Sequence, residues 1–349
     1  MKSWQLVRFG GPEGLRIEDV PSPVPGSHEV RIRVAYAGIN PVDRSMIQGR
    51  FDFIRLPFTP GAEIAGRVEG VGPGVMEHTV GERVAVLPTL WCGTCRFCER
   101  DEPSSCLTNP YLDRAPQILG VSRPGGWAEE VVVPDHNLVR LPPEVSLETA
   151  VTFPVGGVAA HHALRRARLR PQDTVLVMGA SGAVGGFAVQ IARQQGARAF
   201  AVVSQPSHVA ALKELGAEEA WVRTTPDLVQ EIRARTGGLG ADVVLDPLGA
   251  STFATSLECL APMGRLVTCG ILTGNRGEVD LTRHYSRQLE YIGSTTGSRS
   301  DLESLVALAA NGRIKPLVQE WVPFASLPEG IAKLNQHGRL GKVVLRIQP

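Results

Sequence analysis

The sequence predicts an α/β protein with two domains, one rich in β-strands and one built on a parallel sheet with helices on both faces. Its 349 residues are long for one hydrophobic core and sufficient for two. Residues 1–150 hold short β-like runs between Gly and Pro, whereas apolar strands alternate with helical segments from about residue 173. Because near-continuous apolar strands are buried on both faces, the second half predicts a doubly wound parallel sheet.

The β-rich half contains runs such as EVRIRVAYAG (29–38), AGRVEGVG (65–72) and RVAVLP (83–88). Short runs of this kind predict a compact, barrel-like β-unit. The stretch 147–167 changes character and predicts a helix. In the second half, the expected strands are 174–179, 197–204, 241–249, 264–270 and 289–294, and the expected helices are 182–196 and 208–217. The tail ends in GKVVLRI, which predicts a further strand.

The composition is that of a globular protein, with 43% hydrophobic and 20% charged residues. The net charge of +1 favours neither nucleic acid nor an anionic membrane as a partner. No apolar run approaches the roughly 18–20 residues that a membrane span needs. The first residues also lack the apolar core of a signal peptide. We therefore expect a cytoplasmic protein with a small-molecule substrate.

A glycine-rich segment follows the first strand of the predicted parallel sheet. The strand 174–179 runs directly into GASGAVG, and a helix begins there. This placement is typical of a dinucleotide site, in which the pyrophosphate contacts the helix N-terminus. Gly179 would permit the tight turn, Gly182 the approach of the pyrophosphate, and Gly185 close packing of helix and strand. The candidate cofactor-binding residues are Gly179, Ala180, Ser181, Gly182, Ala183, Val184 and Gly185.

The residues after the second strand indicate which dinucleotide binds. An NAD site usually has Asp or Glu there, which accepts hydrogen bonds from the ribose. Here Val203 is followed by Ser204-Gln-Pro-Ser207-His208, without a carboxylate that would repel a 2′-phosphate. Ser204 and Ser207 can donate hydrogen bonds, and His208 can add positive charge when protonated. These residues predict NADP(H), although His208 can equally be read as an exposed residue of a helix's first turn.

Four of the six cysteines lie within residues 92–106. Cys92, Cys95, Cys98 and Cys106 supply the four soft ligands that zinc prefers in a tetrahedron. Because four cysteines leave no open position for a substrate, they predict one structural zinc per chain. Two disulfides are the alternative, but they are rare in the cytosol.

The motifs together resemble the medium-chain dehydrogenase/reductase superfamily over the whole chain. Supporting phrases are PGAEIAGRVEGVG (60–72), VGERVAVLP (80–88), GGWAEEVVVP (125–134) and GKVVL (341–345). The resemblance implies a GroES-like β-barrel catalytic domain formed by residues 1–152 and 296–349, with a zinc lobe at about 91–110. It also implies a Rossmann cofactor domain at 153–295. Further candidate cofactor-binding residues are Gly270, Ile271 and Lys342.

Zinc alcohol dehydrogenases of this superfamily hold a second, catalytic zinc, and the matching positions of this chain lack its ligands. Where those enzymes have Cys, His and a final Cys or Asp, this sequence has Asn40, Ala62 and the ligand-free stretch around Val155. Val42 stands where the family has a proton-relaying Ser or Thr. Since a catalytic zinc needs three protein ligands, the resemblance predicts that this chain holds no catalytic zinc.

The run Asn40-Pro41-Val42-Asp43 is similar to the zinc-free branch of quinone oxidoreductases and enoyl reductases. Asn40 is the candidate for orienting ribose or substrate, with Asp43 in support; the alternative for both is capping of a turn or strand end. Phe51 stands where enoyl thioester reductases have a Tyr thought to assist protonation. Phe51 and Val155 would form apolar walls of the pocket.

These residues predict hydride transfer between NADP(H) and a conjugated carbonyl, such as an enone or enoyl ester, or a quinone. One alternative is an alcohol dehydrogenase with an unusual metal site that uses Glu63 and a nearby His, either His161 or His162. Another is an NADPH-binding protein with little turnover. The apolar strand 289–294 predicts a homodimer or a homotetramer made of two such dimers.

Overall fold

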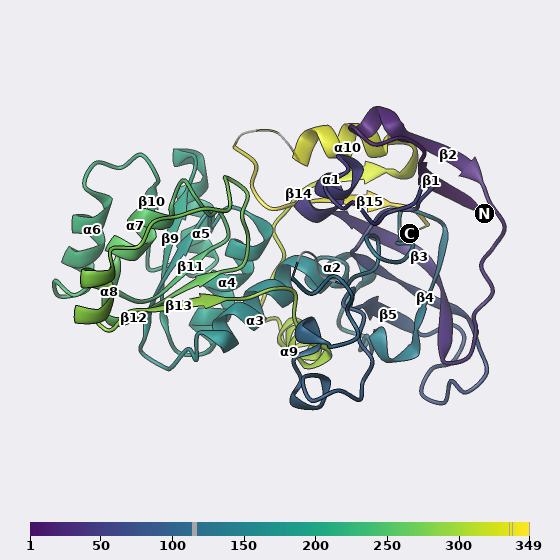
Figure 1. The fold of residues 1–349 in the computed structure, drawn as a ribbon, viewed down its shortest axis with the longest axis horizontal. Helices are drawn as coiled ribbons and strands as arrows, with labels where there is room; N and C mark the ends of the chain where they lie inside the picture. Colours follow the sequence, from purple (N-terminus) through teal and green to yellow (C-terminus); the bar gives the residue numbers. More distant parts are fainter. Residues whose placement is uncertain (114–116, 335, 337, 349) are drawn as a thin grey trace. The chain divides into compact units, whose positions relative to one another are not determined.

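The computed structural model describes residues 1–113, 117–334, 336 and 338–348, and divides the chain into two compact units (Figure 1). Unit 1 comprises Met1–Val158, Gly297–Gly312 and Val318–Pro349, and unit 2 comprises Ala159–Thr296 and Arg313–Leu317. The sequence predicts these boundaries at 152/153 and 295/296, whereas the structure has them at 158/159 and 296/297. The return of 313–317 to unit 2 had no sequence signal that we recognised.

Unit 1 is built around a seven-stranded sheet of mostly antiparallel strands. Its order is β14-β15-β3-β4-β5-β7, with β6 also paired to β3, and β1 and β2 form a separate two-stranded sheet. The long strand β3 pairs with β6 at its start and with the C-terminal strand β15 at its end. The strands are β1 (Lys2–Leu6), β2 (Leu15–Asp19), β3 (Glu29–Ile39), β4 (Ile64–Val71), β5 (Arg83–Val86), β6 (Glu130–Pro134), β7 (Leu138–Arg140), β14 (Val318–Pro323) and β15 (Lys342–Arg346).

The helices of unit 1 are short, and the one expected over 147–167 is divided. α2 (Leu147–Ala150) is followed by a π-helical segment, Phe153–Gly157, and then by α3 (Val158–Arg166), where unit 2 begins. Pro154 lies at the start of the π-segment and has no N–H for a regular helical hydrogen bond, which explains the interruption. The other helices of this unit are α1 (Pro41–Ile47), α9 (Arg299–Ala310) and α10 (Leu327–Leu334).

Unit 2 is a parallel six-stranded sheet in the order β10-β9-β8-β11-β12-β13. All five expected strands form, while β10, α6, α7 and α8 were not recognised in the sequence. The strands are β8 (Thr174–Met178), β9 (Arg198–Val203), β10 (Glu219–Val222), β11 (Ala241–Asp246), β12 (Leu260–Thr268) and β13 (Glu290–Gly293). The helices are α4 (Ala183–Gln194), α5 (Val209–Glu214), α6 (Leu228–Arg235), α7 (Phe253–Glu258) and α8 (Leu281–Ser286).

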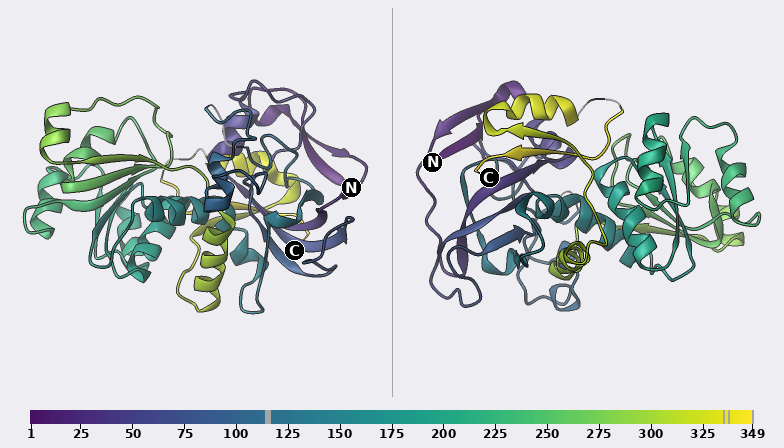
Figure 2. Two further views of the ribbon diagram at one scale, coloured as in Figure 1. Left: turned by 60° about the horizontal axis from the view of Figure 1, so that its bottom comes forward. Right: turned by 180° about the vertical axis from the view of Figure 1, so that it is seen from behind.

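The strand order of unit 2 reverses between β8 and β11. From β8 the chain moves outward through β9 to β10, and from β11 it moves the opposite way through β12 to β13. Because such crossovers are right-handed, opposite directions put helices on opposite faces of the sheet, and both faces carry helices in Figure 2. Dinucleotides bind parallel sheets of this kind at the point of reversal, beyond the carboxyl ends of the strands.

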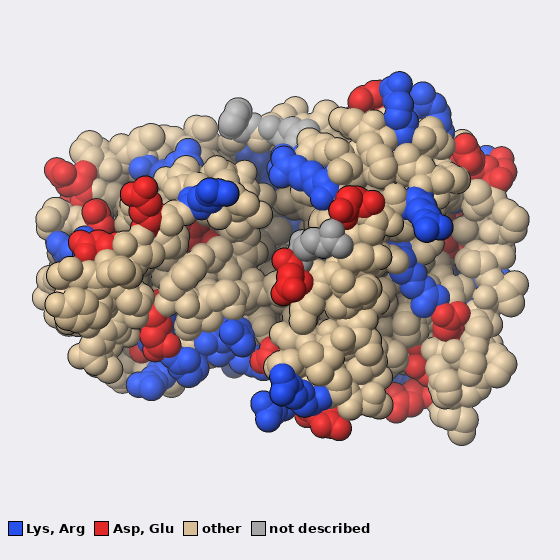
Figure 3. Space-filling model, in the orientation of Figure 1, with Lys and Arg blue, Asp and Glu red and all other residues tan. Residues whose placement is uncertain are grey.

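Each unit has its own hydrophobic core. In unit 1, Trp127 and the inward side chains of β3, β4 and β15 are fully buried, and in unit 2 the core surrounds Phe200 and Leu266. On the face shown in Figure 3, both units carry basic and acidic side chains. A search of the described residues finds no helix that combines the length and apolar character needed to cross a bilayer.

Candidate functional site

The glycine-rich loop after β8 has the conformation that its sequence predicts. Gly179 has φ +62°, a left-handed conformation that suits glycine. A Cβ on Gly185 would lie 2.5 Å from Cα of Ala180, so α4 can approach the loop only because this residue is glycine. Gly182 is the N-cap of α4, and a Cβ there would make only an ordinary contact of 3.5 Å. Packing within the chain therefore does not require a glycine at position 182. The approach of a ligand, which the sequence predicts, remains as the reason for a glycine there.

The loops after β11 and β12 lie at the same edge of the sheet. Both carboxylate oxygens of Asp246 are used by its own loop: one accepts hydrogen bonds from the N–H of Leu248 and Gly249, and the other from the hydroxyls of Thr252 and Ser256. A Cβ on Gly270 would lie 2.4 Å from the carbonyl oxygen of Pro247, so these two loops pack backbone to backbone. Ile271, next in the chain, is 58% exposed. The parallel strand ends thus bring Gly179, Gly270 and Ile271 to one edge.

The segment after β9 differs in part from the expectation. Ser204 and Ser207 are exposed, as a contact with a 2′-phosphate requires. His208 is only 5% exposed, and its Nδ1 is buried without a hydrogen-bond partner. The interpretation of His208 as an exposed residue was wrong, because His208 is the buried last residue of the 3-10 turn Pro206–His208. A contact between His208 and a phosphate stays a prediction.

Sequence reasoning missed Arg223, which follows the unrecognised strand β10. The strands β9 and β10 pair in parallel with Val203 opposite Val222, and the N–H of Arg223 donates to the carbonyl oxygen of Val203 at 2.8 Å. Arg223 is exposed and lies beside Ser204 at the carboxyl edge of the sheet. The available signal was a basic residue after a short half-buried run, EAWV, which lacks the apolar continuity of the other strands.

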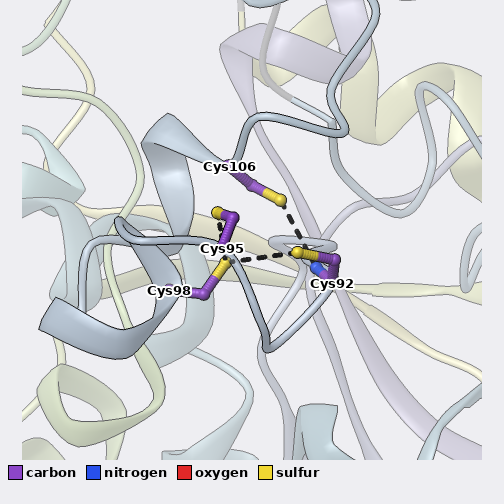
Figure 4. A group of neighbouring side chains, drawn as sticks. All are labelled: Cys92, Cys95, Cys98 and Cys106. Carbon is purple, nitrogen blue, oxygen red and sulfur yellow. Dashed lines mark hydrogen bonds between the residues drawn. The ribbon is translucent and has the colours of Figure 1, made fainter.

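The four clustered cysteines converge on one point in unit 1 (Figure 4). Their sulfur atoms all lie within 4.8 Å of one another, with 3.4 Å between Cys95 and Cys98 and 3.9 Å between Cys92 and Cys98. A zinc tetrahedron with Zn–S bonds of about 2.3 Å has sulfur atoms about 3.8 Å apart. All four are free thiols, at distances that no disulfide has. The residues therefore fit a metal ion, and the alternative of two disulfides is not what the structure contains.

The electrostatics of this cysteine lobe (residues 91–110) also suit a cation. Hydrogen bonds from the backbone and side chain of Thr94 lower the pKa of Cys92 to about 6, which favours the thiolate that a metal binds. Burial and the neighbouring thiol of Cys95 raise the pKa of Cys98 to about 12. Four sulfur atoms this close cannot all carry a charge without a cation between them.

A second polar cluster lies inside unit 1, and it joins four residues from three distant parts of the chain. Asn40, Asp43, Glu63 and Lys342 are each at most 4% exposed. Strand pairing brings them together, because Val343 of β15 lies opposite Ile39 of β3 and so places Lys342 beside Asn40. The Lys342 ammonium donates to Asn40 Oδ1 at 3.0 Å and forms an ion pair with Glu63.

Glu63 is the centre of this cluster. Its Oε2 accepts from the Lys342 ammonium and, at 3.0 Å, from the side-chain amide of Asn40. Its Oε1 accepts from the N–H of Val155 in the π-helical segment, also at 3.0 Å. A Cβ on Gly38 would lie 1.9 Å from Glu63 Oε2, so the carboxylate fits only because Gly38 has no side chain. Glu63 therefore ties together three separate segments of unit 1.

Asp43 holds the backbone around the cluster. Its two carboxylate oxygens accept from the N–H groups of Asn40, at 2.8 Å, and Ala62, at 3.0 Å. The first of these bonds also caps α1, so the capping role that the sequence left open is present. Burial raises the pKa of Asp43 to about 7 and the charge of Glu63 adds to the rise, against the two N–H groups and Lys342. Asp43 therefore holds its proton more readily than an exposed aspartate does.

Phe51 is partly buried against the core of unit 1, and so are Val42 and Val155. Its ring lies 5.9 Å from that of Phe53, which in turn stacks on Tyr111 at 3.7 Å. The expected apolar character of Phe51 and Val155 agrees with this packing, while a role in lining a substrate pocket stays a prediction.

Comparison with known proteins identifies the class. Residues 26–143 match the family described as alcohol dehydrogenase GroES-like domain, and residues 183–311 match zinc-binding dehydrogenase. The chain is 33% identical to an NAD-dependent alcohol dehydrogenase of Sulfurisphaera tokodaii, over 99% of both proteins. It is 32% identical to an acryloyl-coenzyme A reductase of Metallosphaera sedula, over 97% of this chain and 98% of the relative. A crystal structure of an NAD-dependent alcohol dehydrogenase matches with a TM-score of 0.93 and 36% identity, over 99% of each chain.

The fold and the dinucleotide loop thus define an oxidoreductase that uses a pyridine nucleotide. The chain belongs to the medium-chain dehydrogenase/reductase superfamily. Its GroES-like part lies in unit 1 and its Rossmann-like sheet in unit 2.

The catalytic zinc of alcohol dehydrogenases does not fit the residues present. The three matching positions hold Asn40, Ala62 and Val155, and the nearby carboxylate of Glu63 is already bound to Lys342. Among the residues that the structure describes, the four cysteines are the convergent group of three or more metal ligands. His161 and His162 belong to unit 2, where Nδ1 of the buried His162 lies 2.9 Å from the guanidinium of Arg165.

Proposed function

We propose that this protein transfers hydride between NADP(H) and a conjugated carbonyl, such as an enone or enoyl ester, or a quinone, without a catalytic zinc. The observation that carries the proposal is the closed hydrogen-bonding of Glu63. Beside Asn40, Ala62 and Val155, where the resemblance expects the ligands of a catalytic metal, each oxygen of this carboxylate is engaged by the chain itself. The acryloyl-coenzyme A reductase among its relatives adds support, since that name denotes reduction of a conjugated thioester.

The chemistry follows from what the residues of the site can and cannot supply. The cofactor provides the hydride. Without a Lewis acid, a simple ketone loses its main source of charge stabilisation, whereas a conjugated acceptor spreads the new charge along its own π-system. Asn40 can offer its second amide N–H to the carbonyl oxygen of the acceptor, because its other groups are held by Glu63 and Lys342. Since Phe51 cannot donate a proton, the second hydrogen must come from water or from another residue of the site.

The purified protein is expected to consume NADPH with an enone or a quinone at a rate that a chelator such as EDTA does not change. Because general acid catalysis typically contributes about 10²–10⁴-fold, the absence of a tyrosine at position 51 predicts modest turnover. Absorbance at 340 nm measures the reaction, with primary and secondary alcohols plus NADP⁺ as the comparison. Rapid alcohol oxidation that is lost on metal removal would support the alcohol dehydrogenase alternative. Binding of NADPH without turnover would support the other alternative, an NADPH-binding protein with little turnover.

The exposed residues after β9 and β10 support NADP(H) over NAD(H), although the dehydrogenase relatives are named NAD-dependent. Ser204 has no neighbouring acid in its segment, and Arg223 beside it can pair with a 2′-phosphate.

Ser204→Asp is expected to reverse the preference between the two cofactors, since its carboxylate repels the 2′-phosphate and accepts from a ribose hydroxyl. Arg223→Ala should weaken NADPH binding by about 10-fold, the order of one charge-assisted hydrogen bond, and leave NADH unchanged. Titration calorimetry with both nucleotides measures this, and Arg198→Ala serves as the control, since Arg198 pairs with Glu218 at the opposite end of β9. Equal affinities of the unmodified protein for both cofactors would refute the assignment.

The edge strand β13 supports a homodimer or a tetramer made of two such dimers. β13 is the last strand of the sheet, and Tyr291 on it is 53% exposed. An exposed edge with apolar side chains can pair with a second copy across a two-fold axis. Light scattering at micromolar concentration is expected to give at least twice the chain mass, and a monomer would contradict the proposal.

A further inference from the structure

The loops that follow β11 and β12 in unit 2 are hydrogen-bonded to each other. Thr273 donates from its N–H and its hydroxyl to the carbonyl oxygen of Leu248, both at 2.8 Å, and its hydroxyl accepts from the N–H of Ser251 at 3.0 Å. The N–H of Ala250 donates to the carbonyl oxygen of Gly274 at 3.1 Å. Residues 247–252 and 270–274 therefore form one body, which we call the double loop.

Two further features fix the double loop in place. Gly249 has φ +91°, and a Cβ there would lie 2.5 Å from the carbonyl oxygen of Gly274 and 3.1 Å from Cα of Ile271. Asp246 is 1% exposed, and the four hydrogen bonds that its carboxylate accepts all come from residues 248–256. Since a buried charge must be paired, the first loop cannot move away from Asp246 without a large cost.

The double loop lies on the side of the sheet that the nicotinamide half of a dinucleotide would occupy. The pyrophosphate is expected at Gly182, after β8, and the adenosine half is expected at Ser204, after β9. Because the two halves extend in opposite directions from the pyrophosphate, the nicotinamide half would extend toward β11 and β12, which follow β8 on its other side. At this edge, Ile271 and Leu272 of the double loop are 58% and 48% exposed.

We infer that Asp246 and Thr273 are positioning residues, which hold the double loop so that Gly270 and Ile271 meet the nicotinamide ring in one fixed place. The inference rests on the proposed hydride transfer and adds the residues that would set the position of the ring. Neither side chain has to touch the cofactor, because Asp246 is buried and the Thr273 hydroxyl is bonded to the first loop. Hydride transfer needs the reacting atoms to be about 3–3.5 Å apart, so a loosened double loop should harm the nicotinamide half alone.

The test compares NADPH with 2′,5′-ADP, which has the adenosine half and the 2′-phosphate but no nicotinamide. Thr273 is exposed, and Thr273→Val keeps the shape of its side chain while it removes both bonds of the hydroxyl. We expect the Kd of NADPH to rise by roughly 3- to 10-fold, the order of one or two hydrogen bonds, and kcat with an enone to fall. The Kd of 2′,5′-ADP should change by less than about 2-fold. Titration calorimetry measures both constants.

Thr236→Val is the matched control. The hydroxyl of Thr236 donates to the carbonyl oxygen of Ile232 and accepts from the N–H of Gly240, both at 2.9 Å, but it lies before β11, at the opposite edge of the sheet. This variant should lower Tm and leave both dissociation constants unchanged. Asp246→Asn keeps one acceptor oxygen, so its ratio of the two constants should lie between those of the wild type and Asp246→Ala. If Asp246→Ala does not fold, Thr273→Val and Asp246→Asn still carry the test.

Equal weakening of NADPH and 2′,5′-ADP in Thr273→Val would overturn the inference, and so would no weakening of either, because a double loop that positions the ring must act on that half alone. If NADH is the preferred cofactor, NADH and ADP replace the two probes, so the inference is tested even where the choice of NADP(H) fails. The binding constants are also separate from the enone assay. Selective weakening without enone reduction rejects only the proposed function, and enone reduction without selective weakening rejects only this inference.

Discussion

Replacing Cys95 by Ser is expected to remove the zinc from the cysteine lobe and to unfold the lobe. Four thiolates share one cation, and a structural zinc stabilises its fold by about 10 kcal/mol or more in small domains. In this lobe, the cysteines are joined by turns and two short 3-10 helices, Cys98–Arg100 and Pro103–Ser105, which have little core of their own. Loss of one ligand therefore removes most of what orders residues 91–110.

The effect should extend to α9. Asp101 of the lobe accepts hydrogen bonds from the hydroxyls of Ser298, at 2.8 Å, and Ser300, at the N-terminus of that helix. Elemental analysis should show zinc falling from one atom per chain to none, and hydrogen exchange should rise in the lobe and at the start of α9. Cys269→Ala, outside the lobe, is the control and should keep one zinc. Two zinc atoms per wild-type chain, or unchanged zinc in Cys95→Ser, would contradict the assignment.

Gly38→Ala is expected to lower the free energy of unfolding by about 3–5 kcal/mol, the cost of breaking a buried ion pair. The added Cβ would lie 1.9 Å from Oε2 and 3.0 Å from Cβ of Glu63. Glu63 can avoid it only by moving, and movement breaks its bonds to Lys342, Asn40 and Val155. One methyl group should therefore disturb the whole buried cluster.

Urea unfolding followed by tryptophan fluorescence measures the loss, since Trp127 donates a hydrogen bond to the carbonyl oxygen of Gly38 at 3.2 Å. Gly70→Ala on the neighbouring strand β4 is the matched control, because its Cβ would meet nothing closer than 3.7 Å. That variant should change stability by less than about 1 kcal/mol. A Gly38→Ala protein as stable as Gly70→Ala would show that Glu63 is not held as tightly as its contacts indicate.

The sequence alone determined those features that depend on residues close together in the chain. The period of the apolar residues predicted the parallel sheet, and the spacing of Gly179 and Gly185 predicted the turn and the close packing seen there. The spacing of the four cysteines predicted a metal-sized cluster, because short turns leave few ways to place four sulfur atoms. Local signals failed where they were weak or misleading, as at the short strand β10 before Arg223 and at the buried His208.

Only the tertiary structure decided the partner of Glu63. Lys342 and Asn40 are 302 residues apart, and their contact depends on the register in which β15 pairs with β3. A sequence shows an isolated lysine in a strand and an isolated glutamate after an alanine, and either could face solvent. The register removes both from water, and a buried charge must then be paired. For that reason the sequence could predict which metal ligands are missing from this site, but not that Glu63 is paired there with the ammonium group of Lys342.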